Sequence, residues 1–453
     1  MGKHKIPENG IYDARTLGAG RMLLLGFQHM FAMFGATILV PILTGLDVSN
    51  TLLFAGLGTL LFHLITGGKV PAFLGSSFAF LGGYAAVAPM IDDTLPNTEL
   101  LPYACFGVAC AGLVYAVLAA LVRAFGAEKV MRFFPPIVTG PIIIAIGLNL
   151  SGSAINNCSG SWWIAIAAIG IIVAANIWGR GMVKIIPILL GVVGSYLLAV
   201  IFDAGVRETL VKNVSEAALL ALPVKMDQTV FGLFARGNVD RDMLLTAVIT
   251  IVPLSLATMV EHIGDVSAIS STCGRNYIQD PGLHRTLLGD GLATTLAALF
   301  GAPANTTYGE NTGVLALSRI YDPRVIRIAA VLAMCFSFSP KFAAIISSMP
   351  GGTIGGVSLV LYGMISAVGV RNVVENQVDF TKSRNVLIAA LILVLSIGIS
   401  YSKAGALTFG SVSLSGLAVG SLVGIVLNAV MPGKDYVFGQ NPQGDESVNF
   451  IIQ

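Results

Sequence analysis

Three acidic residues stand inside or beside long apolar runs of this 453-residue chain, where they could take part in chemistry. Glu261 and Asp265 are four residues apart, so on a helix they share one face. Glu310 begins a later apolar run. A carboxylate surrounded by hydrocarbon is costly unless it faces a polar cavity. Carboxyl groups around one cavity repel each other when ionised, so we expect one of them to hold a proton near neutral pH.

Other polar residues near these acids allow two interpretations. Gln28-His29 and His262 lie in apolar runs and could support the acids or carry protons, although buried histidines are more often satisfied core residues. Glu261 and Glu310 could likewise be structural carboxylates bonded to neighbouring helices, and Asp265, which is nearer a helix end, could have a structural role facing another helix. Asp290 is expected near a helix entrance. No nucleophile with an adjacent base is evident, which argues against an enzyme.

The ligand that suits such residues is a flat ring with alternating hydrogen-bond donors and acceptors. Paired carboxylates accept N–H hydrogens, and free backbone N–H groups at a helix start donate to carbonyl oxygens. Phe78 follows Ser76-Ser77 in a glycine-bearing stretch and could stack on a ring, although an aromatic in an apolar run usually packs against lipid or a helix. Uracil and xanthine are rings of this kind.

The elements that must position these residues lie in a membrane. Apolar residues make up 55% of the chain and charged residues 11%, against about 25% in soluble domains. Mean hydropathy is +0.82. This composition excludes a cytosolic enzyme, a nucleic-acid binder and a disordered scaffold. The five cysteines form no CxxC pair, so neither a disulfide framework nor a zinc site is indicated.

Fourteen apolar runs are long enough, or nearly so, to cross a bilayer. Most of the basic residues then fall on the side of the N-terminus, so both termini are expected to be cytoplasmic in a multi-pass protein of the plasma (inner) membrane. The long segment 203–242 is expected outside as a loop, and the runs at 72–91, 136–151 and 305–319 are candidates for broken segments. The expected spans are 22–44, 51–67, 72–91, 100–122, 136–151, 162–178, 185–202, 243–270, 286–300, 305–319, 326–348, 353–370, 385–401 and 412–430.

An internal repeat relates the two halves of the chain. Gln28-His29 and Glu261-His262 open similar stretches, and each is followed, after 49 and 47 residues respectively, by a hydroxyl-rich element at Ser77 and Tyr308. A proline, Pro71 or Pro303, precedes each element. Seven spans separate the members of each pair, so the halves are inverted in the membrane. In transporters of this design the ligand binds at the midplane, where discontinuous segments meet.

At this point the chain is seen to resemble the nucleobase-ascorbate transporter family over about residues 20–430. The stretch from Glu310 to Arg319, ENTGVLALSR, is similar to the family signature, with Ser318 where threonine is usual. A leading Glu and a closing Arg resemble the uracil branch, whereas purine members generally begin with Gln. The stretch Gln28–Thr37 and the Ser76-Ser77-Phe78 break are also similar to the uracil branch.

The resemblance implies roles for individual residues. Glu261 and Glu310 would hold the N–H edges of a pyrimidine, the backbone at Tyr308 and Gly309 would meet a carbonyl, and Phe78 would contact the ring. The uracil branch often carries His one turn after the helix glutamate, where this chain has Asp265, as purine members often do. Proton coupling is therefore expected from Glu261, Asp265 and Glu310. The residues expected to support the site are Gln28, His29, Ser77, His262 and Asn311.

The family fold implies an all-α membrane protein of seven plus seven inverted spans, with a short strand in each of the broken spans 3 and 10. Members are commonly dimeric, so a homodimer is possible, and no cofactor or metal is implied. The implied division is an N-terminal segment (1–20), core domain parts 21–134 and 243–350, gate domain parts 135–242 and 351–431, and a cytoplasmic tail (432–453).

Together these features predict a secondary transporter that imports uracil with protons by alternating access between core and gate. The partners are the small-molecule substrate, protons and membrane lipid, with no nucleic acid. A purine (xanthine or uric acid type) proton symporter on the same fold is the nearest alternative. A membrane-embedded enzyme using His262 and a passive channel are disfavoured, because carboxylates closing around one ligand suit binding better than catalysis or conduction.

Overall fold

The computed structural model of the chain describes residues 10–91, 95–237, 239–403, 405–409, 412–434 and 436. For residues 182, 185, 310, 317, 409, 412 and 413 it describes the backbone alone. The helices are α1 (Ala19–Thr44), α2 (Val48–Ile65), α3 (Leu81–Val87), α4 (Leu101–Phe125), α5 (Ala127–Met131), α6 (Pro136–Ser159), α7 (Trp162–Ile177), α8 (Met182–Ile185), α9 (Pro187–Phe202), α10 (Ala204–Glu216), α11 (Val230–Ala235), α12 (Arg241–Ile251), α13 (Ser255–Cys273), α14 (Leu283–Leu299), α15 (Gly309–Ser318), α16 (Pro323–Ser337), α17 (Pro340–Ser347), α18 (Gly351–Glu375), α19 (Ser383–Ser400) and α20 (Gly416–Val430). The strands are β1 (Leu74–Ser76), β2 (Asn305–Thr307), β3 (Ala406–Phe409) and β4 (Val412–Ser415).

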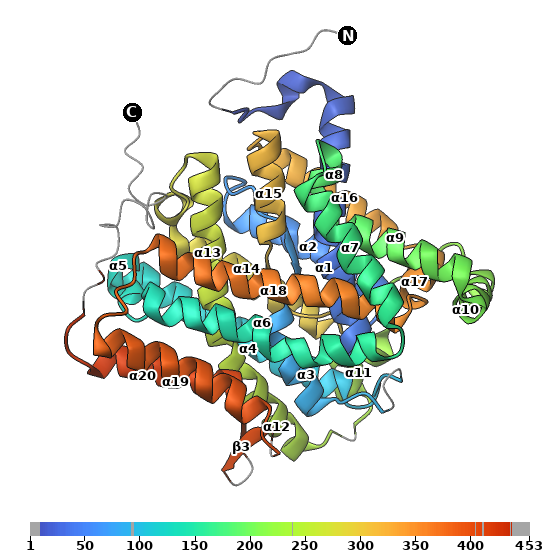
Figure 1. The fold of residues 1–453 in the computed structure, drawn as a ribbon. Helices are drawn as coiled ribbons and strands as arrows, with labels where there is room; N and C mark the ends of the chain where they lie inside the picture. Colours follow the sequence, from blue (N-terminus) through green and yellow to red (C-terminus); the bar gives the residue numbers. More distant parts are fainter. Residues whose placement is uncertain are drawn as a thin grey trace.

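Most of these helices form one bundle in which long apolar helices lie side by side (Figure 1). Within the described residues, seven helices are long and apolar enough to cross a bilayer, with α12 and α13 counted as one. Two bent pairs, α9 with α10 and α16 with α17, raise the number to as many as nine. The bends are 108° and 88°. Shorter apolar helices include α7 and α20. The protein is therefore a multi-pass membrane protein built mainly of helices.

The helices pack in pairs that repeat between the two halves of the chain. α2 of the first half lies along α16 of the second, and in the same way α14 of the second half lies along α4 of the first. Likewise α7 packs on α9 while α19 packs on α20, and α6 and α18 form an extensive contact between these groups. Each half therefore supplies an equivalent set of partners, which is the arrangement expected of an inverted repeat.

One expected span is interrupted and one expected loop contains helices, in ways that the hydropathy pattern does not show. The run at 243–270 consists of α12 and α13 joined by the 3-10 turn Val252–Leu254, at a proline that cannot continue the helical hydrogen bonds. The segment 203–242, expected as a loop, contains α10 and α11. Asp203 caps α10 by accepting hydrogen bonds from Gly205 N–H and Val206 N–H, so a polar helix starts directly after the apolar one.

The N-terminal residues 10–17 form a strap across the ends of α13, α15 and α16. Ile11 pairs with Ile320, and its N–H donates to the carbonyl of Arg319, which ends α15 in the left-handed conformation (φ 52°). The Tyr12 hydroxyl donates to the Cys273 carbonyl at 2.6 Å. Asp13 forms ion pairs with Arg15 and with Arg324 in α16. The strap thus fastens three helix ends of the second half.

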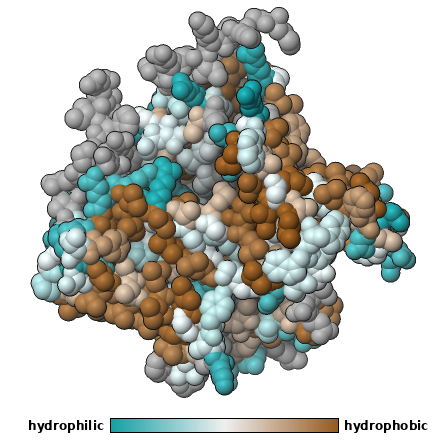
Figure 2. Space-filling model, in the orientation of Figure 1, coloured by the Kyte–Doolittle hydropathy of each residue, from teal (hydrophilic) through white to brown (hydrophobic). Residues whose placement is uncertain are grey.

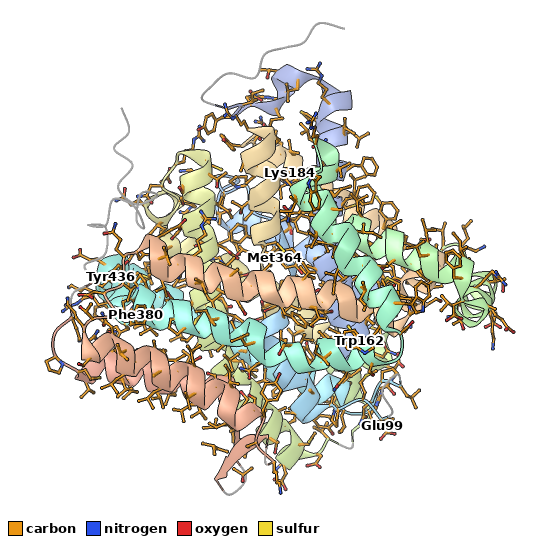
Figure 3. The ribbon with its side chains drawn as sticks, viewed as in Figure 1. Glu99, Trp162, Lys184, Met364, Phe380 and Tyr436 are labelled. Atoms are coloured by element: carbon orange, nitrogen blue, oxygen red, sulfur yellow. The ribbon has the colours of Figure 1, made fainter. Side chains whose placement is uncertain are left out.

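The surface agrees with a protein surrounded by lipid. Hydrophobic residues dominate the middle of the face in Figure 2, and hydrophilic residues gather mostly toward its margins. Among the exposed apolar side chains, Ile177 is 64%, Val394 66% and Val430 77% exposed. Figure 3 shows Met364 midway along this face, with Lys184 and Glu99 toward opposite ends. Apolar exposure on this scale is unusual for a soluble monomer and is the expected state of a bilayer-facing surface.

Candidate functional site

Two short strands from opposite halves of the chain meet in the middle of the fold. Strands β1 and β2 pair antiparallel, with Leu74 opposite Thr307 and Ser76 opposite Asn305. Two flanking bonds extend the ladder, from Ser77 N–H to the Ala304 carbonyl at 2.8 Å and from Tyr308 N–H to the Phe73 carbonyl at 3.0 Å. Because non-helical backbone cannot face lipid, pairing satisfies these groups inside the protein. Both strands lie in segments that the sequence marks as broken.

Threonines on the neighbouring helices hold both strands from the side. The Thr59 hydroxyl in α2 accepts a hydrogen bond from Leu74 N–H at 2.9 Å. The Thr294 hydroxyl in α14 donates to the Asn305 carbonyl at 2.6 Å. The Asn305 amide in turn donates across to the Phe54 carbonyl at 2.9 Å. These bonds replace the helical partners that each broken segment has lost.

Tyr308 locks the two broken segments together. Its hydroxyl donates to the Ser76 carbonyl at 2.8 Å and lies 3.4 Å from the Thr37 hydroxyl in α1. The ring passes directly over Gly75, where an added methyl group would lie 2.5 Å from two ring carbons. Only glycine at position 75 therefore permits this approach. The Tyr308 side chain is structural in this arrangement, and its N–H is used by the strand ladder, so the expectation that its backbone donor meets a ligand is not met.

The acids expected on one helix face do lie near the broken segments. Thr307, the last residue of β2, donates its hydroxyl to Asp265 Oδ2 at 3.1 Å and lies 3.3 Å from His262 Nδ1. Gly309, the first residue of α15, also faces Asp265, because a methyl group added there would lie 3.6 Å from Asp265 Oδ1. Glu261 and Asp265 are half-buried in α13. The structure therefore brings Glu261, Asp265, His262 and Gly309 to one region.

Glu310 is the second residue of α15, and the structure describes its backbone without its side chain. Its backbone position is at the N-terminal turn of a helix that starts directly after β2. Free N–H groups of such a turn favour a carboxylate or a ligand carbonyl oxygen nearby.

Asp290 is a buried acid whose position differs from the one predicted from the sequence. It was expected near a helix entrance, but it lies midway along α14 and is fully buried. Its Oδ2 atom lies 2.9 Å from Nδ1 of His262, which is also fully buried. The sequence does contain one indication of this burial. In the run Gly289-Asp290-Gly291 the acid lies between two glycines, which allow close helix packing. His262 thereby links Asp290 to Thr307 and Asp265.

The residues expected to support the site from α1 are structural. The Asn311 amide donates to the carbonyl of His29 at 3.0 Å and lies 3.2 Å from His29 Nδ1, so α1 and α15 are tied together. His29 is fully buried, and Gln28 is half-buried on the preceding position. Ser77 is buried directly before Phe78. These contacts place Asn311 and His29 beside the acids without bringing them into the same hydrogen-bond chain.

Phe78, the aromatic residue expected at the site, is buried against a helix of the second half. It is 6% exposed, and its ring meets Tyr362 of α18 edge to face with 5.7 Å between the centroids. Tyr362 was not expected from the sequence, because an aromatic residue in a long apolar helix has no local feature that separates it from a core residue. The contact joins the broken segment to α18. Within the described part of the chain, no group of three His, Cys, Asp or Glu side chains could hold a metal ion.

Comparisons with known proteins support a transporter. The model described as "Permease family" matches residues 20–405. A uracil permease of Bacillus caldolyticus is 41% identical over 442 residues, which cover 94% of this chain and 95% of that protein. A uracil permease of Bacillus subtilis (strain 168) is 38% identical over 418 residues, 89% of this chain and 91% of that protein.

The fold has a solved counterpart at low sequence identity. The structure of SLC26A9 superposes with a TM-score of 0.60 at 15% identity, over 95% of this chain and 70% of that one. At this identity the likeness concerns the fold alone.

Proposed function

Since the chain belongs to this permease family, as its resemblance to the nucleobase-ascorbate transporters predicted, we propose that it imports uracil together with protons across the plasma (inner) membrane. It is a transporter and not an enzyme. Both termini would be cytoplasmic and the chain would cross the membrane fourteen times, with the shorter and broken helices completing the seven plus seven arrangement. Membrane lipid would surround it, and a homodimer is part of the proposal.

The observation that carries the proposal is the meeting of Glu261 and Asp265 with the start of α15. Half-buried carboxylates on one face of α13 lie beside the N-terminus of α15, which begins directly after strand β2. Carboxylates accept N–H groups, and a helix start donates N–H groups to a carbonyl oxygen. Uracil offers both partners, because N–H groups and carbonyl oxygens alternate along its edges. The carboxylates would accept from the N–H groups, and the helix start would donate to a carbonyl oxygen.

In the proposed complex each half of the chain supplies a different kind of contact. Glu261 and Glu310 would accept the two ring N–H groups, and the backbone N–H of Gly309 would donate to a ring carbonyl oxygen. The N–H of Tyr308, expected to share this role, instead donates to the Phe73 carbonyl. Phe78 would cover the ring face, where aromatic contact adds about 0.5–1.5 kcal/mol beyond the area buried. Gln28, His29, Ser77, His262 and Asn311 would hold these groups in position.

Proton coupling would follow from the crowding of acids. When Glu261, Asp265 and Glu310 are all ionised, their repulsion opposes closure around a neutral ring, and one proton removes part of it. Uptake of a proton from outside would thus favour uracil binding, and the proton and uracil would then both be released inside. A membrane potential adds about 2.3 kcal/mol per net charge per 100 mV to this cycle.

Alternating access would be a movement of the core (21–134 and 243–350) against the gate (135–242 and 351–431). The broken segments and α13 belong to the core, while α6 and α18 belong to the gate. The Phe78–Tyr362 contact crosses this boundary, so it would open and close as the two domains move. Flux would follow the difference in affinity between the two facing states.

The test is uptake of labelled uracil into proteoliposomes across an imposed pH gradient. Glu261→Gln and Glu310→Gln should abolish accumulation, because the amide cannot exchange a proton. Glu99→Gln, at an exposed position far from α13, is the matched control and should leave uptake intact. Normal accumulation by both site variants, or accumulation that an uncoupler leaves unchanged, would contradict proton symport.

A purine substrate is the second candidate, favoured by one observation. Asp265 accepts the Thr307 hydroxyl and faces Gly309, so it lies where the ligand's edge would be. It is the residue that resembles purine members of the family. Competition of labelled uracil uptake by xanthine, hypoxanthine and guanine separates the candidates, because a purine transporter would be inhibited most by a purine.

A further inference from the structure

A cavity of about 220 Å³ lies beyond Phe78, at the end of the molecule away from the N-terminal strap. Phe78 and Ala79 of the first broken segment line it from one side, and Leu254 from the turn before α13 lines it from another. Its far wall is made by the start of α20 and by the β3–β4 hairpin, which lies near α12 at the bottom of Figure 1. Neither Glu261, Asp265 nor Tyr308 lines this space. The cavity is therefore separate from the acids, with Phe78 bordering it.

The cavity contains an amide whose hydrogen-bonding groups have no protein partner. Asn149 of α6 lines it, and its Nδ2 and Oδ1 atoms are both buried without a hydrogen-bond partner in the described part of the chain. Leaving a buried donor or acceptor unsatisfied costs about 1–3 kcal/mol. Such a cost is usually offset by water or by a ligand. A further polar residue, Thr250, lies at the same wall as Leu254 and is 2% exposed.

The chemistry of the cavity matches one edge of a nucleobase. A primary amide presents a carbonyl acceptor and an N–H donor side by side, so it can pair with a ring that carries N–H next to C=O by two hydrogen bonds, as asparagine does with adenine. The rest of the lining is mainly apolar, with an aromatic ring at one border. This combination of apolar walls with a few placed polar groups is typical of small-molecule sites.

We propose that this cavity is an outer binding station, in which the amide of Asn149 holds the incoming uracil ring against Phe78 before it reaches the acids. The proposal rests on the proposed function. Uracil would first exchange its water for the Asn149 amide and then pass Phe78 when the Phe78–Tyr362 contact opens. Because the cavity is bounded by α6, α20 and β3 of the gate and by Phe78 and Leu254 of the core, movement between them would change its size.

The station would affect how fast uracil enters and leave the affinity of the inner site unchanged. Asn149→Leu keeps a similar volume and removes both hydrogen bonds. We expect uptake at low uracil concentration to fall about tenfold through a higher KM, with Vmax retained. The dissociation constant of the purified protein for uracil and the final accumulation ratio should stay at the wild-type values.

The matched control is Asn156→Leu, the same change at an exposed position of the same helix α6. It should leave both KM and Vmax unchanged. A merely structural defect in Asn149→Leu would lower Vmax and the number of binding sites together, which the KM against Vmax comparison detects. Thr250→Val provides a second variant of the same wall, and it should change KM in the same direction by a smaller factor.

Two results would overturn the station. Unchanged uptake kinetics in Asn149→Leu and Thr250→Val would show that uracil enters without using the cavity. A parallel loss of uracil affinity in the purified protein would place Asn149 in the inner site instead. If the wild-type protein itself fails to transport uracil, the proposed function fails, and this outcome is distinct from either result.

Discussion

The two broken segments share one frame and differ in their chemistry. Each follows a proline, contains a three-residue strand, and is held by a threonine of the neighbouring helix. After β1, however, the chain continues with Phe78 and a short apolar helix that is largely buried. After β2 it continues with Gly309, Glu310 and Asn311. A repeated scaffold therefore carries an aromatic and apolar continuation in one half and a polar continuation in the other.

The same difference separates the helices that face these segments. In α1 the pair Gln28-His29 contributes a carbonyl and a buried ring that hold Asn311. In α13 the equivalent pair Glu261-His262 is followed by Asp265 and backed by Asp290. The second half has thus acquired the ionisable groups, and the first half supports them. If this division is correct, polar substitutions in the two halves should have unequal effects.

The largest effect is expected from Asp265→Asn. The amide can still accept the Thr307 hydroxyl, so the strand end should keep its position, but the group no longer exchanges a proton or carries charge. Proton-driven uptake should fall about tenfold or more. The comparison in the first half is Ser77→Ala, which should lower uptake less than Asp265→Asn, because the Ser77 hydroxyl has no hydrogen-bond partner in the described part of the chain. Equal losses in both variants, measured in proteoliposomes, would contradict the division.

The next largest effect is expected at Asp290. Asp290→Leu removes the buried acid that lies 2.9 Å from His262 Nδ1, so the fully buried ring keeps only the Thr307 hydroxyl, at 3.3 Å, beside that nitrogen. We expect a loss of about 1–3 kcal/mol in folding free energy, seen as a lower melting temperature in detergent. Asp290→Asn keeps a hydrogen-bonding side chain and should recover part of that loss. A melting temperature unchanged by the leucine would show that the pair contributes nothing.

A smaller effect is expected from the threonines that hold the strands. Thr59→Val leaves Leu74 N–H without its side-chain partner, whereas Thr294→Val removes only a donor to the Asn305 carbonyl. Each substitution should cost about 1 kcal/mol in folding free energy, with Thr59→Val the more destabilising, because an unsatisfied N–H is tolerated less well than a carbonyl. Thermal melting of both variants checks the order. The reverse order would show that the frame depends more on the second half.

The smallest effect is expected at the strap, which holds the end of α15. The hydrogen-bonded guanidinium of Arg15 lowers the pKa of Asp13 to about 2, from an ordinary value of 3.8. A lowered carboxyl pKa means that the ion pairs stabilise the strap above about pH 4 and lose this effect as the pH falls toward 2. Hydrogen exchange of residues 10–17 should therefore be faster in Asp13→Asn than in wild type at pH 7. Transport should be nearly unchanged, since these pairs are exposed.

The sequence predicted the parts of the site that depend on local pattern. The four-residue spacing of Glu261 and Asp265 fixes their shared helix face, and the prolines with hydroxyl-rich stretches mark the breaks at β1 and β2. The resemblance to a known family is confirmed by the comparisons. The residues that were missed, Tyr362, Asn149 and the burial of Asp290, depend on which helices meet across the bundle. That information is not contained in the hydropathy of any one helix.

The strand pair also sets an order of events while the chain is being made. The backbone of β1 at residues 74–76 has no strand partner until residues 305–307 have left the ribosome. At a synthesis rate of about 5–20 residues per second, this wait lasts about 10 to 50 seconds. During that time unpaired N–H and C=O groups must be kept from lipid by α2, by Thr59 or by the insertion machinery. The first half therefore completes the backbone hydrogen bonds of β1 only after the second half has been synthesised.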